Sequence, residues 1–169
     1  MMGLLFTWVS LPVYANEQAT AIKNIQEIRI SLDSVWVVMG GGILVFFMQA
    51  GFALVESGSV RSKNTINVLM KNYMDACLGG LVFWLVGFGL MFGLNTTGWF
   101  GWSHFAPNDM ESWNWNLLFF QMMFAATATT IASGAMAERI HFVDYVVSAA
   151  VVSGLMYPIL GSWAWGSLL

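Results

Sequence analysis

The sequence predicts an all-α membrane protein. Of its 169 residues, 58% are hydrophobic and only 9% are charged, which leaves too few charges to solvate the surface of a soluble domain. The mean hydropathy is +0.69. Four long stretches carry no charged residue, and about 20 apolar residues are enough for a helix to cross roughly 30 Å of hydrocarbon. The net charge of −3, without a basic stripe, argues against a nucleic-acid partner.

The first element, residues 1–15, is predicted to be a signal peptide. An apolar stretch from Leu4 to Val13 runs into Val13-Tyr14-Ala15, which suits cleavage after Ala15. No Lys or Arg precedes this stretch, so an uncleaved anchor is the alternative. Residues 16–33 are polar enough to form an external segment, and isoleucines at helical spacing would let that segment lie on the membrane surface.

Four membrane-spanning helices are expected within residues 34–169. Their predicted bounds are Val35–Val55, Ala76–Gly93, Trp115–Ala137 and Tyr145–Leu169, and the second helix could begin earlier. Glycines cluster in the first two spans, for example Gly40, Gly41 and Gly42. Because small residues let helices approach closely in lipid, these glycines indicate helix packing rather than a phosphate-binding loop.

The basic residues predict the direction of the spans. Arg61, Lys63 and Lys71 lie between the first two spans and Arg139 lies between the last two, whereas residues 95–114 contain no Lys or Arg. The positive-inside rule places the basic loops in the cytoplasm. The prediction is therefore a multi-pass protein of the cell inner or plasma membrane with its N-terminus outside.

Ionisable residues inside a membrane are candidates for function because an unpaired charge is destabilising there. Glu56 closes the first span and is expected to be an interfacial carboxylate near Arg61. Asp75 is predicted to lie deeper and could pair with Lys71, four residues earlier on the same helix face. A direct role for Asp75 in substrate binding is the alternative.

Other kinds of chemistry find no support in the sequence. His104 and His141 are predicted on opposite sides of the membrane, and neither has a second ligand at metal-binding spacing. The single Cys77 offers no disulfide framework. We therefore expect no metal site, no cofactor and no enzymatic activity.

Aromatic residues are expected to converge at the outer ends of the third and fourth spans. Phe119, Phe120 and Phe124 lie on one span, and Trp163 and Trp165 lie on the other. Ring faces attract a small cation by about 0.5 to 2 kcal/mol, so such a group could concentrate a monovalent, ammonium-like ion at a pore mouth. An ordinary aromatic belt at the membrane interface is the alternative.

Several stretches of the sequence resemble the Amt ammonium transporters and their Mep and Rh relatives. They are Gln49-Ala50-Gly51-Phe52-Ala53 with Glu56, Gly58-Ser59-Val60-Arg61-Ser62-Lys63-Asn64, Lys71-Asn72 to Asp75-Ala76, Gly134-Ala135-Met136-Ala137-Glu138-Arg139, and Tyr157-Pro158 leading into Trp163-Ala164-Trp165. The likeness extends from about Val35 to the end of the chain. Several long motifs in the same order make a chance match implausible.

The resemblance implies a fold and a set of binding residues. Members of this family have eleven transmembrane helices, ten of them in two inverted repeats, and assemble as homotrimers with one pore per subunit. This chain would supply about four helices of the first half. Phe124 resembles the outer phenylalanine gate, Phe120 resembles a vestibule wall, and Trp165 resembles the tryptophan that receives ammonium or methylammonium.

The sequence also departs from the family pattern. It ends at Leu169, before the fifth-helix Asp, the two pore histidines, the vestibule Ser and the tail through which PII-type proteins regulate the family. We therefore expect that this polypeptide alone does not transport ammonium. The alternatives are an ammonium-sensing membrane domain of a signalling protein and a gene remnant without function.

Overall fold

The structure, a computed structural model, describes residues 3–96, 98–110 and 112–165, with side chains for residues 16–96, 98–110 and 114–165. These residues form helices joined by loops, so the predicted all-α class is confirmed. They fall into two units, Met1–Trp36 and Val37–Leu169. Each unit is described separately.

The first unit is the helix α1, Gly3–Val37. The predicted external segment is thus helical, and the isoleucines Ile22, Ile25, Ile28 and Ile30 are exposed along it. Thr20 and Ser31 donate hydrogen bonds to the carbonyls one turn earlier, at 2.8 and 2.9 Å. Residues 1–2 and the side chains of residues 3–15 lie outside the described part, so the signal peptide stays a prediction.

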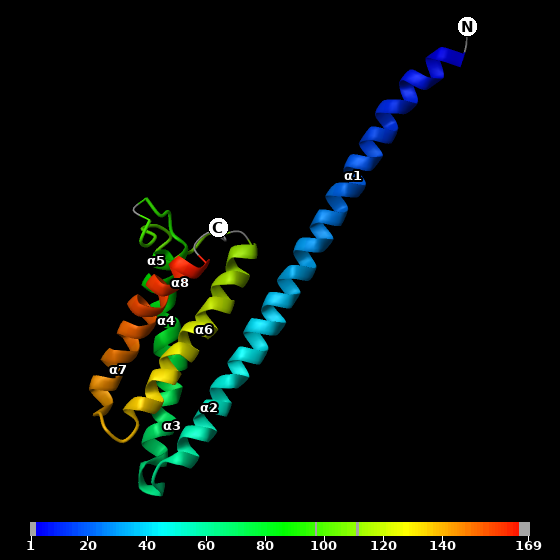
Figure 1. Cartoon of the computed structure of the whole chain (residues 1–169). Helices are drawn as coiled ribbons and strands as arrows, with labels where there is room; N and C mark the ends of the chain where they lie inside the picture. The colour runs from blue at the N-terminus through cyan, green and yellow to red at the C-terminus, as the bar shows by residue number, and fades with distance from the viewer. Residues whose placement is uncertain (1–2, 97, 111, 166–169) are drawn as a thin grey trace. The chain divides into compact units, whose positions relative to one another are not determined.

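The second unit is a bundle of helices (Figure 1). After the π-helical segment η1 (Val38–Val45) come α2 (Phe46–Ser59), the 3-10 turn η2 (Ser62–Asn64), α3 (Thr65–Met74), η3 (Asp75–Gly79), α4 (Gly80–Val82), η4 (Phe83–Gly87), α5 (Phe88–Phe92), α6 (Ser112–Met136), α7 (Phe142–Val151), η5 (Val152–Met156) and α8 (Tyr157–Trp165). The segments η3, η4 and η5 are also π-helical.

The structure contains four helical stretches that are long and apolar enough to cross a membrane, as predicted. They are Asn16–Ser59, Ser62–Phe92, Asn114–Met136 and Phe142–Trp165. The last two agree with the expected spans within a few residues, apart from residues 166–169, which lie outside the described part. The second begins well before Ala76 because its early polar residues, among them Lys71, Asn72 and Asp75, are buried inside the bundle.

Helix α6 forms the centre of the bundle and packs against η1, α2, η3 and η5. Its contact with η1 is close because a Cβ atom at Gly41 would collide with the ring of Phe120, and one at Gly42 would collide with the ring of Phe119. The predicted packing role of these two glycines is confirmed. The hydrophobic core lies where Phe83, Phe88, Met91, Phe92, Leu117 and Leu118 meet.

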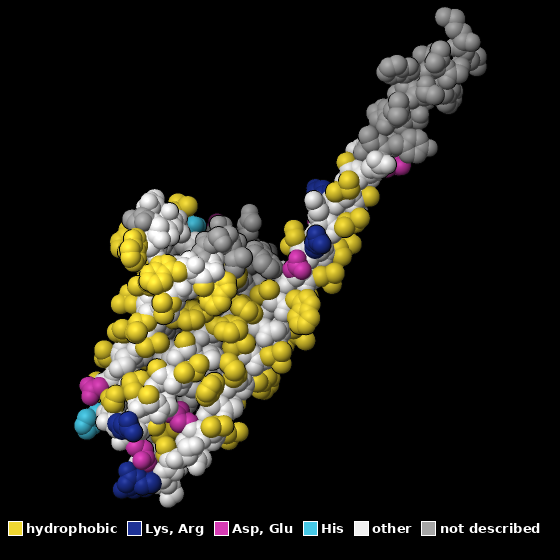
Figure 2. Space-filling view, viewed as in Figure 1, with side chains coloured by type: hydrophobic (Ala, Val, Ile, Leu, Met, Phe, Trp, Pro, Cys, Tyr) yellow, Lys and Arg dark blue, Asp and Glu magenta, His cyan; other side chains and the backbone are white. Residues whose placement is uncertain are grey.

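The outer face of the second unit is apolar over its flanks, and charged side chains gather at one end (Figure 2). At this end the loop after α2 meets the loop after α6, since Arg61 forms an ion pair with Glu138. At the other end, residues 93–96 and 98–110 fold back onto α5 and η4. Backbone hydrogen bonds hold them there, from Gly101 to the Leu90 carbonyl (2.8 Å) and from Ala106 to the Leu85 carbonyl (3.0 Å).

Candidate functional site

Two of the predicted binding residues form an aromatic pair on α6. The ring centroids of Phe120 and Phe124 are 4.8 Å apart, with an interplanar angle of 41°. Both rings are partly buried, and Gly41 leaves the space that Phe120 occupies. The pair is therefore held in place rather than spread along a lipid-facing surface.

Trp165, the third predicted residue, lies at the last described turn of α8. Its side chain is 43% exposed. Helix α8 packs against α6, and its C-terminal end lies at the same end of the bundle as the N-terminal end of α6 (Figure 1). Among the aromatic pairs within the described residues, Trp165 stacks on neither Phe120 nor Phe124. A partly exposed tryptophan therefore lies at the end of the bundle where α6 begins, and the phenylalanine pair lies further along α6.

Trp163 has a different environment from Trp165. Its indole nitrogen donates a hydrogen bond to the Trp99 carbonyl at 2.7 Å, and the two rings meet edge to face at 5.9 Å. Ser162 donates to the same carbonyl at 3.0 Å. Trp163 therefore ties α8 to the loop of residues 93–110.

A second group of polar residues lies in the bundle interior around Asp75. This carboxylate is fully buried. Its Oδ2 atom accepts hydrogen bonds from the Tyr145 hydroxyl at 2.5 Å and from the Thr130 hydroxyl at 3.2 Å. Thr130 also lies 2.7 Å from Gln49 Oε1, and the Gln49 amide nitrogen donates to Thr127 at 3.4 Å.

The environment of Glu56 differs from the prediction. Its two oxygens accept hydrogen bonds from Asn72 (2.6 Å) and from Ser133 (2.8 Å). Arg61, its predicted neighbour, instead pairs with Glu138. Glu56 therefore faces the interior of the bundle, where side-chain amides and hydroxyls take the place of an interfacial partner.

The predicted pair of Asp75 and Lys71 does not form. Lys71 is 2% exposed, and its ammonium group donates to the Ile140 carbonyl at 3.2 Å. The same group lies 5.0 Å from the centroid of the Tyr145 ring. The side chain points toward the start of α7 because a carbonyl and a ring face are available there, while hydroxyl groups already occupy one oxygen of Asp75.

We call this group the polar cluster, and it joins all four spans. Its members are Gln49, Glu56, Lys71, Asn72, Asp75, Thr130, Ser133 and Tyr145. Of these residues, only Glu56, Lys71 and Asp75 are candidate site residues from the sequence alone. A usable signal was present for α6, since Thr127, Thr130 and Ser133 repeat every third residue and so lie on one helix face. No comparable signal points to Tyr145.

Glu138 connects the two loops at the charged end of the bundle. This residue has a φ of 60°, in the left-handed region, just after α6 ends. Its carboxylate accepts hydrogen bonds from Asn64 (2.8 Å) and from the Arg61 backbone (3.1 Å), and pairs with the Arg61 guanidinium at 3.3 Å. The bonds from Asn64 and Arg61 lower the pKa of Glu138 from 4.5 to about 2.

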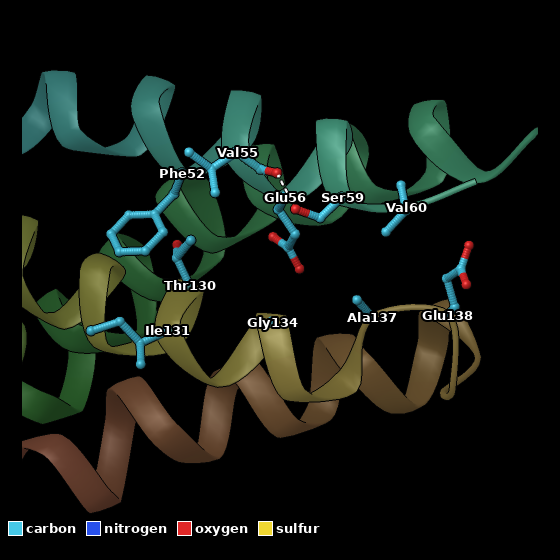
Figure 3. Close-up of a pocket in the computed structure, with 10 residues that line it drawn as sticks. All are labelled: Phe52, Val55, Glu56, Ser59, Val60, Thr130, Ile131, Gly134, Ala137 and Glu138. Atoms are coloured by element: carbon cyan, nitrogen blue, oxygen red, sulfur yellow. Dashed lines mark hydrogen bonds between the residues drawn. The ribbon is translucent and has the colours of Figure 1, made fainter. Parts of the chain in front are cut away.

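A pocket of about 450 Å³ lies between α2 and α6 (Figure 3). It extends from Val60 and Glu138 at the charged end to Glu56 and Thr130 of the polar cluster, and the Glu56 carboxylate projects into the space between the two helices. Apolar side chains such as Phe52 form the rest of the wall. Within the described residues, no group of three or more His, Cys, Asp or Glu side chains could hold a metal ion.

The chain is similar to known ammonium transporters. Residues 35–168 match the model of the Ammonium Transporter Family. The chain is 48% identical to a putative ammonium transporter of Synechocystis over 82% of this chain and 26% of the relative. It is also 48% identical to the ammonium transporter Amt2 of Archaeoglobus fulgidus, over 82% of this chain and 30% of the relative.

A solved structure named Sensor Amt Protein has the same fold. It superposes with a TM-score of 0.81 at 40% identity, over 85% of this chain and 36% of the other. The chain thus spans about a quarter to a third of the length of these curated relatives.

Proposed function

Because this chain belongs to the ammonium transporter family, we propose that it forms part of a path for ammonium across the membrane, with Phe120, Phe124 and Trp165 at the outer mouth. The observation that carries the proposal is the tilted pair of Phe120 and Phe124 at 4.8 Å, in the half of α6 that leads to the end of the bundle where the Trp165 side chain is 43% exposed. Methylammonium, which keeps the positive charge and adds one methyl group, belongs to the same substrate class.

The proposed recognition rests on the charge of the ion. An ammonium ion near the exposed face of Trp165 gains a cation–π attraction of about 0.5 to 2 kcal/mol without losing all of its water. The partly buried rings of Phe120 and Phe124 offer no hydrogen bonds beyond this point. Trp165 would therefore select a cation, and the phenylalanine pair would restrict passage to a small species.

The proposal includes an orientation and an assembly. Arg61, Lys63 and Arg139 lie in the two loops that Glu138 brings together, so one end of the bundle concentrates positive charge. By the positive-inside rule this end faces the cytoplasm of an inner or plasma membrane, and the N-terminus lies outside. A homotrimer, as the resemblance to the family implies, belongs to the same proposal.

The test is uptake of labelled methylammonium by proteoliposomes that contain the protein as its gene encodes it. Replacing Trp165 by Leu removes the ring face, so the apparent KM should rise roughly 2- to 30-fold, which corresponds to about 0.5 to 2 kcal/mol. Trp36→Leu is the matched control, because Trp36 belongs to the other unit and its side chain is 74% exposed. An unchanged KM in the Trp165 variant would remove this residue from the site.

A second candidate function is ammonium sensing. The similarity to the protein named Sensor Amt favours it, since that protein shares the fold at 40% identity. A sensor would bind ammonium, and its affinity for ammonium would fall in the Trp165→Leu variant, but it would show no uptake in proteoliposomes. Measuring binding and uptake on the same preparation separates the two functions.

A further inference from the structure

Two buried acceptor atoms of the polar cluster receive no hydrogen bond. The Oδ1 atoms of Asp75 and Asn72 are buried and have no hydrogen-bond partner. Turning the Asn72 amide over would not help, because its nitrogen already donates to Glu56 (2.6 Å) and to the Val68 carbonyl (3.1 Å). A buried acceptor without a donor destabilises the fold, so a ligand that donates a hydrogen bond to either atom would stabilise it.

Thr130 adds to the shortage of donors. Its hydroxyl carries one proton and lies within reach of three acceptors, which are Gln49 Oε1 (2.7 Å), the Ala126 carbonyl (3.1 Å) and Asp75 Oδ2 (3.2 Å). At most one of them receives that proton. When the proton goes to Gln49, Asp75 keeps a single protein donor, the Tyr145 hydroxyl.

The cluster is also short of positive charge. It contains two carboxylates, Glu56 and Asp75, and one ammonium group, Lys71. Lys71 donates to a backbone carbonyl and lies over the Tyr145 ring, so it forms no direct hydrogen bond to either carboxylate. When both carboxylates are ionised, the cluster has one negative charge more than positive charges, and such a charge inside a membrane requires a partner.

The two residues with unpartnered atoms lie on one helix face. Asn72 and Asp75 are three residues apart on a continuous helical stretch, which puts their side chains on the same face. Asp75 is also the first residue of the π-helical segment η3, and such segments are frequent at functional sites. Glu56 bridges from Asn72 to the pocket between α2 and α6, which leads to the charged end (Figure 3).

We propose that Asn72, Asp75 and Glu56 form an internal binding site for one ammonium ion, separate from the proposed outer site at Phe120, Phe124 and Trp165. Ammonium has one positive charge and four N–H donors, so it can both balance the negative charge and donate to the two unpartnered oxygens. A water molecule has two donors and no charge. The identity of the ion rests on the proposed function; the need for a small donor-rich cation rests on the cluster alone.

The test is a crystal structure of the protein as its gene encodes it, in rubidium chloride. Rubidium resembles ammonium in size and charge, and it gives an anomalous signal. We expect a peak beside Asp75 Oδ1 and Asn72 Oδ1, lowered to about half by ammonium of equal concentration and affinity. A peak without anomalous signal in the rubidium crystal is water and would overturn the proposal, as would an empty site.

Variants separate this site from the outer one. Asp75→Asn removes one carboxylate and should abolish the inner peak. Glu56→Gln should weaken the inner peak, and this second variant keeps the test possible should the Asp75 variant fail to fold, because Glu56 borders the pocket. Trp165→Leu should leave the inner peak unchanged. In the unaltered protein, absence of a peak at Trp165 together with an inner peak would count against the outer site alone, and the reverse result would count against the inner site alone.

Discussion

The hydrogen bond between Tyr145 and Asp75 allows a sharp test of how the bundle is held together. Tyr145→Phe deletes one hydroxyl and keeps the ring on which Lys71 lies. The residue is fully buried, so bulk water cannot replace the lost donor without repacking. The variant therefore isolates a single hydrogen bond to a carboxylate that joins η3 to α7.

The expected loss follows from the nature of the acceptor. Hydrogen bonds to charged groups contribute about 1.5 to 3 kcal/mol in soluble proteins, but side-chain hydrogen bonds within membranes average about 0.6 kcal/mol and reach about 1.7. For Tyr145, whose partner is a carboxylate, we expect about 1.5 kcal/mol. Tyr157→Phe is the matched control, because its hydroxyl donates to the neutral Gln121 Oε1 at 2.6 Å, and about 0.6 kcal/mol is expected there.

The assay is reversible unfolding in mixed micelles of increasing dodecyl sulfate content, followed by the fluorescence of the nine tryptophans. The free energies of unfolding of both variants are compared with that of the unaltered protein. Equal losses in the two variants would refute the reasoning, since they would show that Asp75 does not accept the bond as an ionised group. A loss near zero for Tyr145→Phe would show that the bond is absent.

Two further predictions concern other parts of the bundle. Gly41→Leu places a side chain where the Phe120 ring lies, so the free energy of unfolding should fall by about 1 to 3 kcal/mol in the same assay. Gly58→Ala is the control and should change this free energy little, because the space around its Cβ position is open. Full stability of the Gly41→Leu variant would contradict the packing described. The lowered pKa of Glu138, about 2, means that its carboxylate stabilises the fold above pH 4.5 and that this stabilisation is lost as the pH falls toward 2. Glu138→Gln should therefore lose less stability than the unaltered protein between pH 6 and pH 3, and equal losses would contradict this role.

The number of spans could be predicted from the sequence because an uncharged apolar stretch has few alternatives in a protein of this composition. The start of the second span could not, because hydropathy counts Lys71, Asn72 and Asp75 as polar wherever they face. Their burial depends on α6 and α7, which come later in the chain.

The residues of the two sites differ in how far the sequence identified them. Phe120, Phe124 and Trp165 could be named from their motifs, although their roles stay proposals. Spacing along the chain suggests Arg61 as the neighbour of Glu56 and Lys71 as the partner of Asp75, whereas the hydrogen-bond donors to both carboxylates come from other helices. Local spacing does not contain that information.

The burial of Lys71 and Asp75 also bears on how the chain enters the membrane during synthesis. Each of these residues raises the free energy of inserting a helix centre from the translocon by about 2.5 to 3.5 kcal/mol. The hydroxyls that bind Asp75 lie 55 and 70 residues later, on Thr130 and Tyr145, and have not yet been synthesised when the second helix emerges. Stable insertion of the second helix would therefore wait for the third and fourth, so the four helices would enter the bilayer as a group rather than singly.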